Sequence, residues 1–598
     1  ALSGTLFLYV IYLNKFVGGS EDMEKKLMLG NEAVARGMYE NSVRVSSAYP
    51  GTPSTEISEY AAKYDEIYAE WAPNEKVALE VAIGASVGGA RSLCAMKHVG
   101  LNVAADPLFT VSYTGVNAGL VIAVADDPSM HSSQNEQDSR NYAKAAKIPM
   151  VEPSDSRECK EFIKYAYELS EKYDTPMLFR LSTRVAHSQS IVELEERDEV
   201  EVKDYEPDIA KYVMMPGSAI KKHPIVEKRI ADMTEYAETT PLNRIEYGDK
   251  KIGVITSGMC YNYVKEAFGD GVSVLKLGMT YPLPVKMIKE FAANVDKLYV
   301  VEELDPFIEE HCRNIGVEVI GKELFPICYE FSTRMIKELI TGKPGAEFSE
   351  PDEDVPARPP VLCPGCPHRG IFYVLNKMKL NVCGDIGCYT LGAVAPLNAI
   401  HTVVCMGASI GMSFGMSLAR GKEFAKNTVA VLGDSTFIHS GITGLIEIVY
   451  NKGINTVLIL DNSITGMTGH QDNPTTGKTL KGEATKQVDL ELLGKAVGID
   501  RVKIVDPFDL EQCETVLKEE LSADEPSLVI VQRPCALLKN VKFPGPIQID
   551  ADTCKKCRMC MKLGCGAIVD RGTHLEIDKT LCVGCGLCKN VCNFGAID

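Results

Sequence analysis

Eight cysteines near the end of the chain constrain its fold more than any other feature of the sequence. They form two runs, Cys554-x2-Cys557-x2-Cys560-x4-Cys565 and Cys582-x2-Cys585-x2-Cys588-x3-Cys592. A chain of 598 residues can bury a sizeable apolar core without disulfide bonds, so this spacing indicates metal ligands rather than a disulfide scaffold. Thiolate ligands persist in a reducing compartment, which predicts a cytoplasmic protein.

The two runs resemble the cysteine pattern of bacterial ferredoxins, in which the fourth cysteine of each run binds the cluster of the other run. The resemblance implies an α+β domain with two [4Fe–4S] clusters, one held by Cys554, Cys557, Cys560 and Cys592 and the other by Cys582, Cys585, Cys588 and Cys565. Four residues rather than three precede Cys565, and neither final cysteine precedes proline, so we expect unusual cluster potentials or stability. A zinc module is the alternative, although zinc does not need eight thiolates in this spacing.

Charge and hydropathy exclude two classes of partner. Lys and Arg total 63 and Asp and Glu total 81, a net charge of −18, which argues against nucleic acid because phosphates require clustered bases. No apolar run reaches the ~20 residues of a transmembrane helix, so we expect no membrane association. We interpret residues 1–22, which precede Met23, as an extra N-terminal segment outside the fold, such as an artefact of upstream translation.

Short β-rich runs separated by helical patterns recur through most of the chain. They include Leu120–Ala125, Ile252–Thr256, Leu298–Val301, Val429–Leu432, Val457–Leu460 and Leu528–Val531. Such runs are typical of parallel sheets that helices cover on both faces. The sequence therefore predicts a multidomain α/β protein with ligands at the carboxyl ends of its strands.

Three stretches are typical of linkers. Residues 191–211 are rich in acids, residues 343–360 combine proline with acids, and residues 543–547 form a short Pro-Gly-Pro hinge. They divide the chain into blocks at 23–190, 212–342, 355–542 and 546–598.

Oxygen ligands follow two neighbouring β-rich runs of the third block. The first run ends at Gly433-Asp434-Ser435, and the second leads into Asp461-Asn462. Magnesium prefers hard oxygen ligands and commonly takes some from a phosphate, so Asp434, Asn462 and the Ile464 carbonyl predict a Mg²⁺ site facing a diphosphate. Glycine at 433 allows close backbone approach. The alternative is a coincidental strand–turn Gly-Asp pair.

This spacing resembles the thiamine diphosphate motif, and the resemblance implies that block 355–542 binds the diphosphate. The same site then includes Gly433, Ser435, Gly466 and Met467, with Met406 as the apolar residue that bends the cofactor. A core methionine is the alternative for Met406.

Asn74-Glu75, followed by Gly84, resembles the segment of thiamine enzymes whose glutamate activates the cofactor. A buried glutamic acid with a raised pKa can exchange a proton with the cofactor's ring nitrogen N1′. Block 23–190 would then be the pyrimidine-binding domain. In the alternative reading, Asn74 caps the helix and Glu75 only favours its dipole, and Glu80 is the rival carboxylate.

Four further cysteines lie outside the terminal runs. Cys363 and Cys366 open the third block, Cys388 follows Gly384-Asp-Ile-Gly, and Cys535 follows the last β-rich run. A related oxidoreductase family binds a cluster near thiamine from similar places, which implies a third cluster here. Inert buried cysteines are the alternative.

Three more motifs, together with the terminal cysteines, resemble the large (alpha) subunits of the indolepyruvate ferredoxin oxidoreductase family, a branch of the 2-oxoacid:ferredoxin oxidoreductases. The motifs are Tyr49-Pro-Gly-Thr-Pro-Ser-Thr-Glu56, Met96-Lys-His-Val-Gly-Leu-Asn102 and Cys363-Pro-Gly-Cys-Pro-His-Arg369. The resemblance implies oxidative decarboxylation of arylpyruvates (indolepyruvate or phenylpyruvate) in aromatic amino acid catabolism. Coenzyme A would accept the acyl group and ferredoxin the electrons, with a smaller beta subunit in a heterodimer or α2β2 assembly.

By the same resemblance, Thr52 binds the substrate carboxylate, and His98 and His439 line the substrate pocket. The alternatives are a turn hydroxyl and satisfied core histidines. Block 212–342 resembles the carboxyl-terminal domain of transketolase-like enzymes and is expected to be structural.

The bases Lys555, Lys556, Arg558 and Lys562 could dock an acidic ferredoxin. Two other functions remain open: a non-oxidative thiamine-dependent decarboxylase, and an electron-transfer subunit with a degenerate thiamine site.

Overall fold

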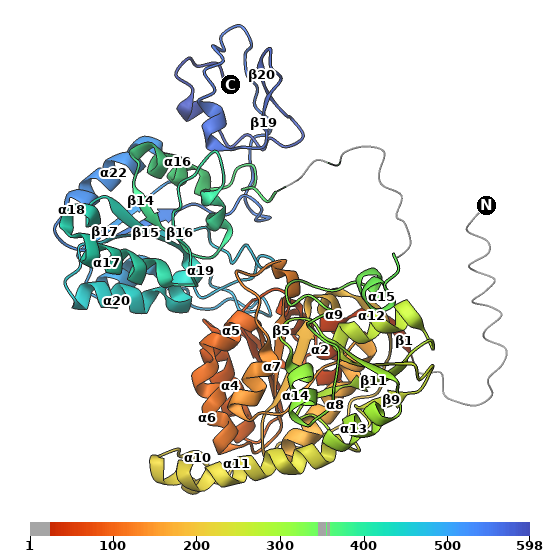
Figure 1. The fold of residues 1–598 in the computed structure, drawn as a ribbon. Coiled ribbons are helices and arrows are strands. Elements are labelled where there is room, and N and C mark those ends of the chain that lie inside the picture. Colours follow the sequence, from red (N-terminus) through yellow and green to blue (C-terminus); the bar gives the residue numbers. More distant parts are fainter. Residues whose placement is uncertain (1–23, 345–354, 356–358) are drawn as a thin grey trace. The chain divides into compact units, whose positions relative to one another are not determined.

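The computed structural model describes residues 24–344, 355 and 359–598. They form two compact units, divided between Phe348 and Ser349, and each unit is described by itself (Figure 1). The extra segment 1–22 and most of the expected linker 343–360 lie outside the described residues. In the described part of the chain, no helix is long and apolar enough to cross a membrane.

A seven-stranded sheet forms the centre of the amino-terminal unit, in the order β12-β6-β7-β5-β4-β2-β3. Its strands are β2 (Val45–Ala48), β3 (Tyr68–Trp71), β4 (Ser92–Lys97), β5 (Leu120–Asp126), β6 (Met150–Val151), β7 (Met177–Ser182) and β12 (Met279–Tyr281). All neighbours are parallel except β12, which runs antiparallel to β6.

Helices cover both faces of this sheet. They are α2 (Gly30–Glu40), α3 (Thr55–Ala61), α4 (Glu75–Val87), α5 (His98–Val103), α6 (Ala105–Thr114), α7 (Ser139–Ala146), α8 (Ser156–Tyr173) and α9 (Thr183–His187). Along β5, Val121 and Ala123 join the core beneath α2 and α8, whereas Ile122 and Val124 join the core beneath α4 and α6. Every residue of β5 is buried, as expected for a parallel strand covered on both faces.

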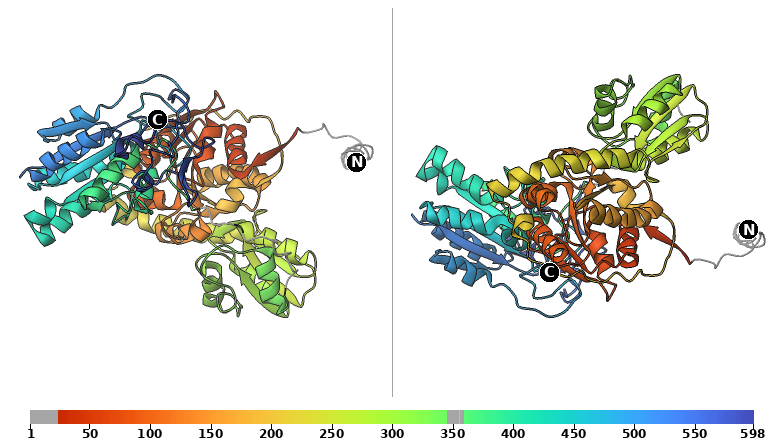
Figure 2. Two further views of the ribbon diagram at one scale, coloured as in Figure 1. Left: turned by 90° about the horizontal axis from the view of Figure 1, so that it is seen from above. Right: turned by 90° about the horizontal axis from the view of Figure 1, so that it is seen from below.

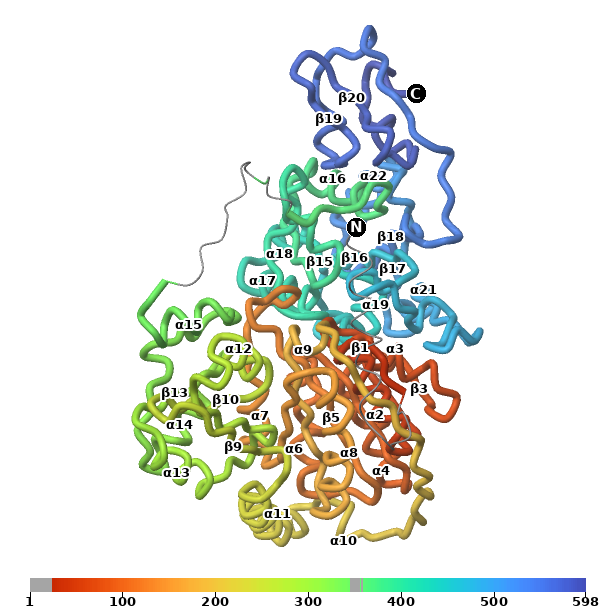
Figure 3. Tube along the Cα trace, turned by 90° about the vertical axis from the view of Figure 1, so that its right-hand side faces the viewer, coloured from red at the N-terminus to blue at the C-terminus, as the bar shows by residue number. Residues whose placement is uncertain are grey.

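The acidic segment expected to be a linker lies against this domain. Strand β8 (Gln189–Glu193) pairs antiparallel with β1 (Lys25–Leu29). Beyond it, the Asp198 amide donates to the Glu40 carbonyl at 2.8 Å, and the Lys203 amide donates to the Gly89 carbonyl at 2.9 Å. Helices α10 (Ile209–Tyr212) and α11 (Pro216–Ala237) then border this unit, as Figure 3 shows.

The middle block builds a second, four-stranded sheet in the order β13-β10-β11-β9, visible as the green lobe in Figure 2. Its strands are β9 (Arg244–Glu246), β10 (Ile252–Ser257), β11 (Ser273–Leu277) and β13 (Lys297–Val301), with helices α12 (Gly258–Phe268), α13 (Val285–Ala293), α14 (Phe307–Asn314) and α15 (Thr333–Thr341). Buried ion pairs tie it to the first domain, including Arg140 with Glu302 and Lys276 with Glu158. Together with β12, they make the middle block continuous with the first sheet.

A five-stranded parallel sheet forms the centre of the carboxyl-terminal unit, in the order β14-β15-β16-β18-β17. Its strands are β14 (Asn381–Cys383), β15 (Thr428–Gly433), β16 (Thr456–Asp461), β17 (Arg501–Val505) and β18 (Ser527–Gln532). The helices are α16 (His368–Met378), α17 (Ala408–Arg420), α18 (Lys422–Ala425), α19 (Asp434–Thr436), α20 (Ile442–Tyr450), α21 (Leu490–Ala496) and α22 (Leu510–Ser522). All six β-rich runs of the sequence are strands in the two units, which confirms the predicted α/β class.

The cysteine-rich end packs onto this same unit. Its strands β19 (Ile568–Asp570) and β20 (Leu575–Ile577) pair antiparallel, and single helical turns span Cys560–Leu563 and Lys589–Val591. Its core contains Leu563, Leu575 and Val591 together with Phe508 of the preceding domain. The Asn590 side chain also donates to the Phe508 carbonyl at 2.7 Å.

Candidate functional site

Glu75 is the first residue of α4, and its side chain is buried, with 5% exposed. The Asn74 side chain caps the helix by accepting from the Val77 amide at 2.9 Å. A Cβ on Gly100 of α5 would lie 2.6 Å from Glu75 Oε1, so glycine at 100 makes room for this carboxyl group. The rival Glu80 is exposed and pairs with Lys76. Of the two candidate carboxylates, only Glu75 has the buried environment that proton exchange requires.

Thr52 lies in the turn after β2, and Ser132 connects this turn to a buried lysine. Ser132 Oγ donates to the Thr52 carbonyl at 3.1 Å, and Lys97 Nζ donates to the Ser132 carbonyl at 2.6 Å. Lys97 ends β4 and is 8% exposed. Burial lowers its pKa to about 8, against the opposing effect of Asp127. Sequence reasoning missed Lys97, although it directly precedes His98 in a motif that had been singled out.

The two candidate histidines lie in different units. His98 starts α5 with 1% exposed; its Nε2 lies 3.2 Å from the Asn135 carbonyl, and its Nδ1 has no hydrogen-bond partner in the described residues. His439 is buried in a π-helical turn, Phe437–Gly441, with Nδ1 2.5 Å from Ser440 Oγ. An unpartnered buried nitrogen is costly, so His98 is only partly satisfied by the protein.

Asp434 and Asn462 follow adjacent parallel strands, β15 and β16. Asp434 is 2% exposed, and its Oδ2 accepts from Thr475 Oγ1 at 2.9 Å and Asn473 Nδ2 at 3.2 Å. Burial, and secondly the nearby Asp461, raise the pKa of Asp434 to about 7. A buried carboxyl group beside a second carboxylate is a chemically suitable place for a divalent cation. Thr475 and Asn473 were missed, because they reach the site from a loop without a marked pattern.

The other residues of the expected diphosphate site surround these ligands. The Asn462 side chain accepts from the Ile464 amide at 3.3 Å, and its Nδ2 lies 3.4 Å from Nε2 of buried His368. Ser435 is buried at the start of α19. A Cβ on Gly466 would lie 3.9 Å from Asn462 Nδ2, whereas Met467 is exposed. The structure therefore gathers Asp434, Ser435, Asn462, Ile464 and Gly466 around one edge of the sheet.

Glycine at 433 has a packing reason that the sequence did not reveal. A Cβ there would lie 2.7 Å from Cε1 of Tyr389, whose hydroxyl donates to the Ile386 carbonyl at 2.8 Å. The group that approaches the backbone of Gly433 closely is therefore the Tyr389 ring of the same domain.

Met406 immediately precedes Gly407, which has φ +83° and leads into α17. Met406 is half-buried and is not part of the buried core. Asp385 orients this junction, since its carboxylate accepts from the amides of Gly407 at 2.9 Å and Ser409 at 3.0 Å. The sequence showed Asp385 within Gly384-Asp-Ile-Gly, but nothing in the pattern assigned it this role.

Cys363, Cys366, Cys388 and Cys535 lie close enough to influence one another electrostatically. Burial, and secondly Cys535 and Cys363, raise the pKa of Cys388 to about 11. The Cys535 amide donates to the Asn462 carbonyl at 2.9 Å, and a Cβ on Gly466 would lie 3.4 Å from Cys388 Sγ. These cysteines therefore lie beside the candidate diphosphate site.

The terminal cysteines gather in two sets. Cys554, Cys557, Cys560 and Cys592 line one cavity. Burial raises the pKa of Cys588 to about 12, with further contributions from Cys585, Cys565 and Cys582. The structure thus brings together the same two sets as the crossed ferredoxin pairing. Among the described residues, no three cysteine, histidine or acidic side chains converge on a single metal ion.

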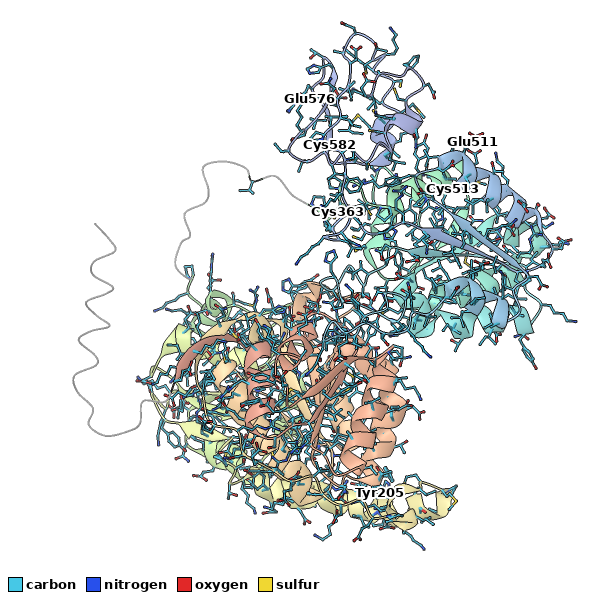
Figure 4. The ribbon with its side chains drawn as sticks, turned by 180° about the vertical axis from the view of Figure 1, so that it is seen from behind. Tyr205, Cys363, Glu511, Cys513, Glu576 and Cys582 are labelled. Carbon is cyan, nitrogen blue, oxygen red and sulfur yellow. The ribbon has the colours of Figure 1, made fainter. Side chains whose placement is uncertain are left out.

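The second terminal set adjoins the cysteines at the start of the domain. A Cβ on Gly365, between Cys363 and Cys366, would lie 2.8 Å from Val583 Cγ2, between Cys582 and Cys585. Figure 4 labels Cys363 and Cys582 on these two neighbouring segments. The set at the start of the domain therefore lies between the strand edge and the two sets of the cysteine-rich end.

Three family models match the chain. Residues 36–251 match "Pyruvate flavodoxin/ferredoxin oxidoreductase, thiamine diP-bdg", residues 385–531 match "Thiamine pyrophosphate enzyme, C-terminal TPP binding domain", and residues 575–598 match "4Fe-4S binding domain". The matches agree with the two thiamine-type sheets and the cysteine-rich end. The protein is therefore a thiamine-diphosphate-dependent 2-oxoacid:ferredoxin oxidoreductase that transfers electrons through iron–sulfur chemistry.

Relatives cover nearly the whole chain. The indolepyruvate oxidoreductase subunit IorA of Archaeoglobus fulgidus is 41% identical over 98% of this chain and 99% of its own. That of Pyrococcus horikoshii is 41% identical over 96% of this chain and 97% of its own. A solved 2-oxoglutarate:ferredoxin oxidoreductase from Magnetococcus marinus covers 55% of this chain and 66% of its own, with 18% identity and a TM-score of 0.46. On the full-length relatives, the chain belongs to the family of indolepyruvate ferredoxin oxidoreductase alpha subunits.

Proposed function

We propose that this chain oxidatively decarboxylates arylpyruvates, with coenzyme A as acyl acceptor and ferredoxin as electron acceptor. The observation that carries the oxidative part is the hydrogen bond from the Cys535 amide to the Asn462 carbonyl, at 2.9 Å. It joins a cysteine set to the residue expected to bind the metal. A non-oxidative decarboxylase has no need for electron acceptors beside its cofactor. The arylpyruvate preference follows the name of the relatives, indolepyruvate oxidoreductase.

Thiamine diphosphate, when bound, supplies an electron sink that lets CO2 leave a 2-oxoacid. Glu75 would hold and return a proton at its carboxyl oxygens, from a buried position beside Gly100. Met406 would support the bent cofactor from the turn that Asp385 orients.

Asp434, Asn462 and the Ile464 carbonyl would hold Mg²⁺. In the cation-free protein the pKa of Asp434 is raised to about 7 by burial and by Asp461. A divalent cation would keep this carboxylate ionised and offset its repulsion from Asp461. Ser435, Gly433, Gly466 and Met467 would border the bound diphosphate.

Thr52, Lys97 and His98 would recognise the 2-oxoacid. Lys97 supplies a buried ammonium group, and a single serine, Ser132, connects it to the Thr52 turn. A substrate carboxylate would give this ammonium a charged partner. It could also bind His98 Nδ1, which has no hydrogen-bond partner among the described residues. His439 is likewise proposed to contact the substrate.

Electrons would leave through three [4Fe–4S] clusters. Their proposed ligands are, in order from the strand edge, Cys363, Cys366, Cys388 and Cys535; then Cys565, Cys582, Cys585 and Cys588; then Cys554, Cys557, Cys560 and Cys592. The exposed bases Lys555, Lys556, Arg558 and Lys562 lie in the segment that carries three cysteines of the last set, and Lys555 and Arg558 line its cavity. They would attract an acidic ferredoxin. A smaller beta subunit would complete a heterodimer or α2β2 enzyme, since the relatives are themselves named as subunits.

The test is an anaerobic assay of the complex of this chain with its beta subunit, supplied with indolepyruvate, coenzyme A and an oxidised viologen dye. Dye reduction that depends on both indolepyruvate and coenzyme A supports the proposal. Release of CO2 without dye reduction would favour a non-oxidative decarboxylase, and absence of thiamine in the denatured complex would favour an electron-transfer subunit. Faster turnover of 2-oxoglutarate than of indolepyruvate would overturn the arylpyruvate assignment.

A further inference from the structure

Arg369 is a buried arginine with an unusual set of partners. It lies near the start of α16 with 2% exposed. Its Nε donates to the Cys363 carbonyl at 3.2 Å, and its Nη1 donates to the Leu563 carbonyl at 2.9 Å. It also donates to the carbonyls of Leu362 and Gly564. In the part of the chain that the structure describes, no carboxylate forms an ion pair with it.

A buried guanidinium group that only neutral carbonyls solvate is costly, because hydrogen bonds satisfy its donors without balancing its charge. The other buried arginines of the described chain have a carboxylate within 4 Å. Arg140 pairs with Asp138 and Glu302, Arg180 pairs with Asp126 and Glu152, and Arg229 lies 3.9 Å from Asp174. Among the described residues, the protein therefore provides no anion that balances the charge of Arg369.

The position of Arg369 indicates which groups could supply the missing negative charge. Its partners belong to two segments: Leu362 and Cys363 open the domain, whereas Leu563 and Gly564 immediately precede Cys565. Cys363 is a proposed ligand of one cluster, and Gly564 is the neighbour of Cys565, a proposed ligand of another. One guanidinium group thus binds the backbone of two proposed cluster sites.

We propose that Arg369 is the shared counter-ion of two iron–sulfur clusters, the one held by Cys363, Cys366, Cys388 and Cys535 and the one held by Cys565, Cys582, Cys585 and Cys588. This inference rests on the cluster sites of the proposed function. A [4Fe–4S] cluster with four thiolates is anionic, and its negative charge grows by one on reduction. A fixed cation therefore stabilises the reduced form of each cluster and raises its reduction potential.

An electron passing between the two proposed sites would be lost by the cluster of the first set and gained by the cluster of the second, with no proton or atom moved. Because Arg369 lies beside both, the transferred charge stays close to the same cation. We expect Arg369 to raise both potentials together rather than to set the difference between them.

The test compares Arg369→Gln and Arg369→Lys with the unmodified complex, by EPR-monitored redox titration and by iron and sulfide content. In Arg369→Gln the equilibrium constant for reducing each of the two adjacent clusters should fall about tenfold, ~59 mV for a one-electron couple. The cluster of Cys554, Cys557, Cys560 and Cys592 should shift less. Arg369→Lys retains the charge and should stay near the original potentials. Arg571→Gln is the matched control, because Arg571 is exposed and pairs with Glu576 in the same domain.

Unchanged potentials in Arg369→Gln, with all clusters present, would overturn the proposal. If Arg369→Gln loses its clusters, Arg369→Lys decides. If Arg369→Lys retains its clusters at near-original potentials, the charge of residue 369 is responsible. If Arg369→Lys also loses its clusters, only the hydrogen bonds of Arg369 matter and the proposal fails. Iron and sulfide for only two clusters in the unmodified complex would instead refute the third cluster of the proposed function.

Discussion

The carboxyl ends of the two large parallel sheets both carry buried charge, but with opposite balance. In the amino-terminal unit, Asp126 at the end of β5 pairs with Arg180 at 2.7 Å. In the carboxyl-terminal unit, the side chains that bind Asp434 among the described residues are the neutral Thr475 and Asn473, and Asp461 lies nearby. The Asp126 carboxylate is neutralised by an arginine of the same sheet, whereas the proposed cation would balance the charge of Asp434. A buried carboxylate therefore belongs to a structural ion pair in one sheet and to a proposed metal site in the other.

The largest effect is expected at Glu75. Glu75→Gln removes the proposed proton donor while keeping the side-chain size, and kcat should fall about 1,000-fold with thiamine diphosphate still bound. Turnover with indolepyruvate and dye, together with thiamine content after denaturation, measures both quantities. Glu80→Gln on the exposed face of α4 is the control and should leave kcat unchanged. Similar losses in the two variants would show that Glu75 has no special role.

Removal of the metal sharpens the contrast between the sheets. Asp434→Asn, or chelation of the unmodified enzyme, should weaken thiamine diphosphate binding about 100-fold, because magnesium loses an ionised ligand. Equilibrium dialysis at several Mg²⁺ concentrations gives the affinity, and added Mg²⁺ should restore the chelated enzyme but not the variant. Binding that is independent of Mg²⁺ in the unmodified enzyme would remove the metal from this edge.

The charged group of the first edge that is proposed to bind substrate is Lys97. Burial lowers its pKa to about 8, so the free enzyme loses the ammonium charge as pH rises through 8. The KM for indolepyruvate should therefore increase above this pH, with a smaller change in kcat. Lys97→Met should raise KM about tenfold and abolish this pH dependence, whereas Lys164→Met, at an exposed site of α8, should do neither. A KM that stays constant from pH 7 to about 9.5 would contradict the assignment.

An effect of similar size that depends on salt is expected at the surface of the cysteine-rich end. Lys555→Glu combined with Lys562→Glu should slow reduction of ferredoxin about tenfold at low salt, and the difference should vanish at high salt because exposed charges are screened. Lys579→Glu is the control on the same domain. An equal rate for the double variant and the unmodified enzyme at low salt would place the ferredoxin surface elsewhere.

The sequence predicted the strands and the grouping of the cysteines because both depend on short-range patterns. A continuous β-rich run such as Leu120–Ala125 is buried on both faces wherever it occurs, and cluster ligands must recur at fixed spacing. Arg369, Lys97 and Asp385 were not predicted, because their roles come from segments distant in sequence. Arg369 meets Leu563 nearly two hundred residues later, and no local pattern encodes that contact.

The acidic segment 191–211 illustrates the same limit. Its composition indicated a solvated connection, yet the Lys203 amide is bound to the Gly89 carbonyl, and a Cβ at 89 would lie 1.9 Å from the Lys203 carbonyl oxygen. Composition reports the average exposure of a segment and does not reveal a few backbone hydrogen bonds that fix its course.

The antiparallel strand β12 has a consequence for how the chain matures on the ribosome. Until β12 emerges, β6 is the unprotected edge of the first sheet, with its backbone donors and acceptors open to other nascent chains. The intervening segment includes α11, α12 and β11, so synthesis must proceed well into the middle block before that edge is sealed. Ribosome pausing between β6 and β12 should therefore increase aggregation, whereas pausing after β12 should not.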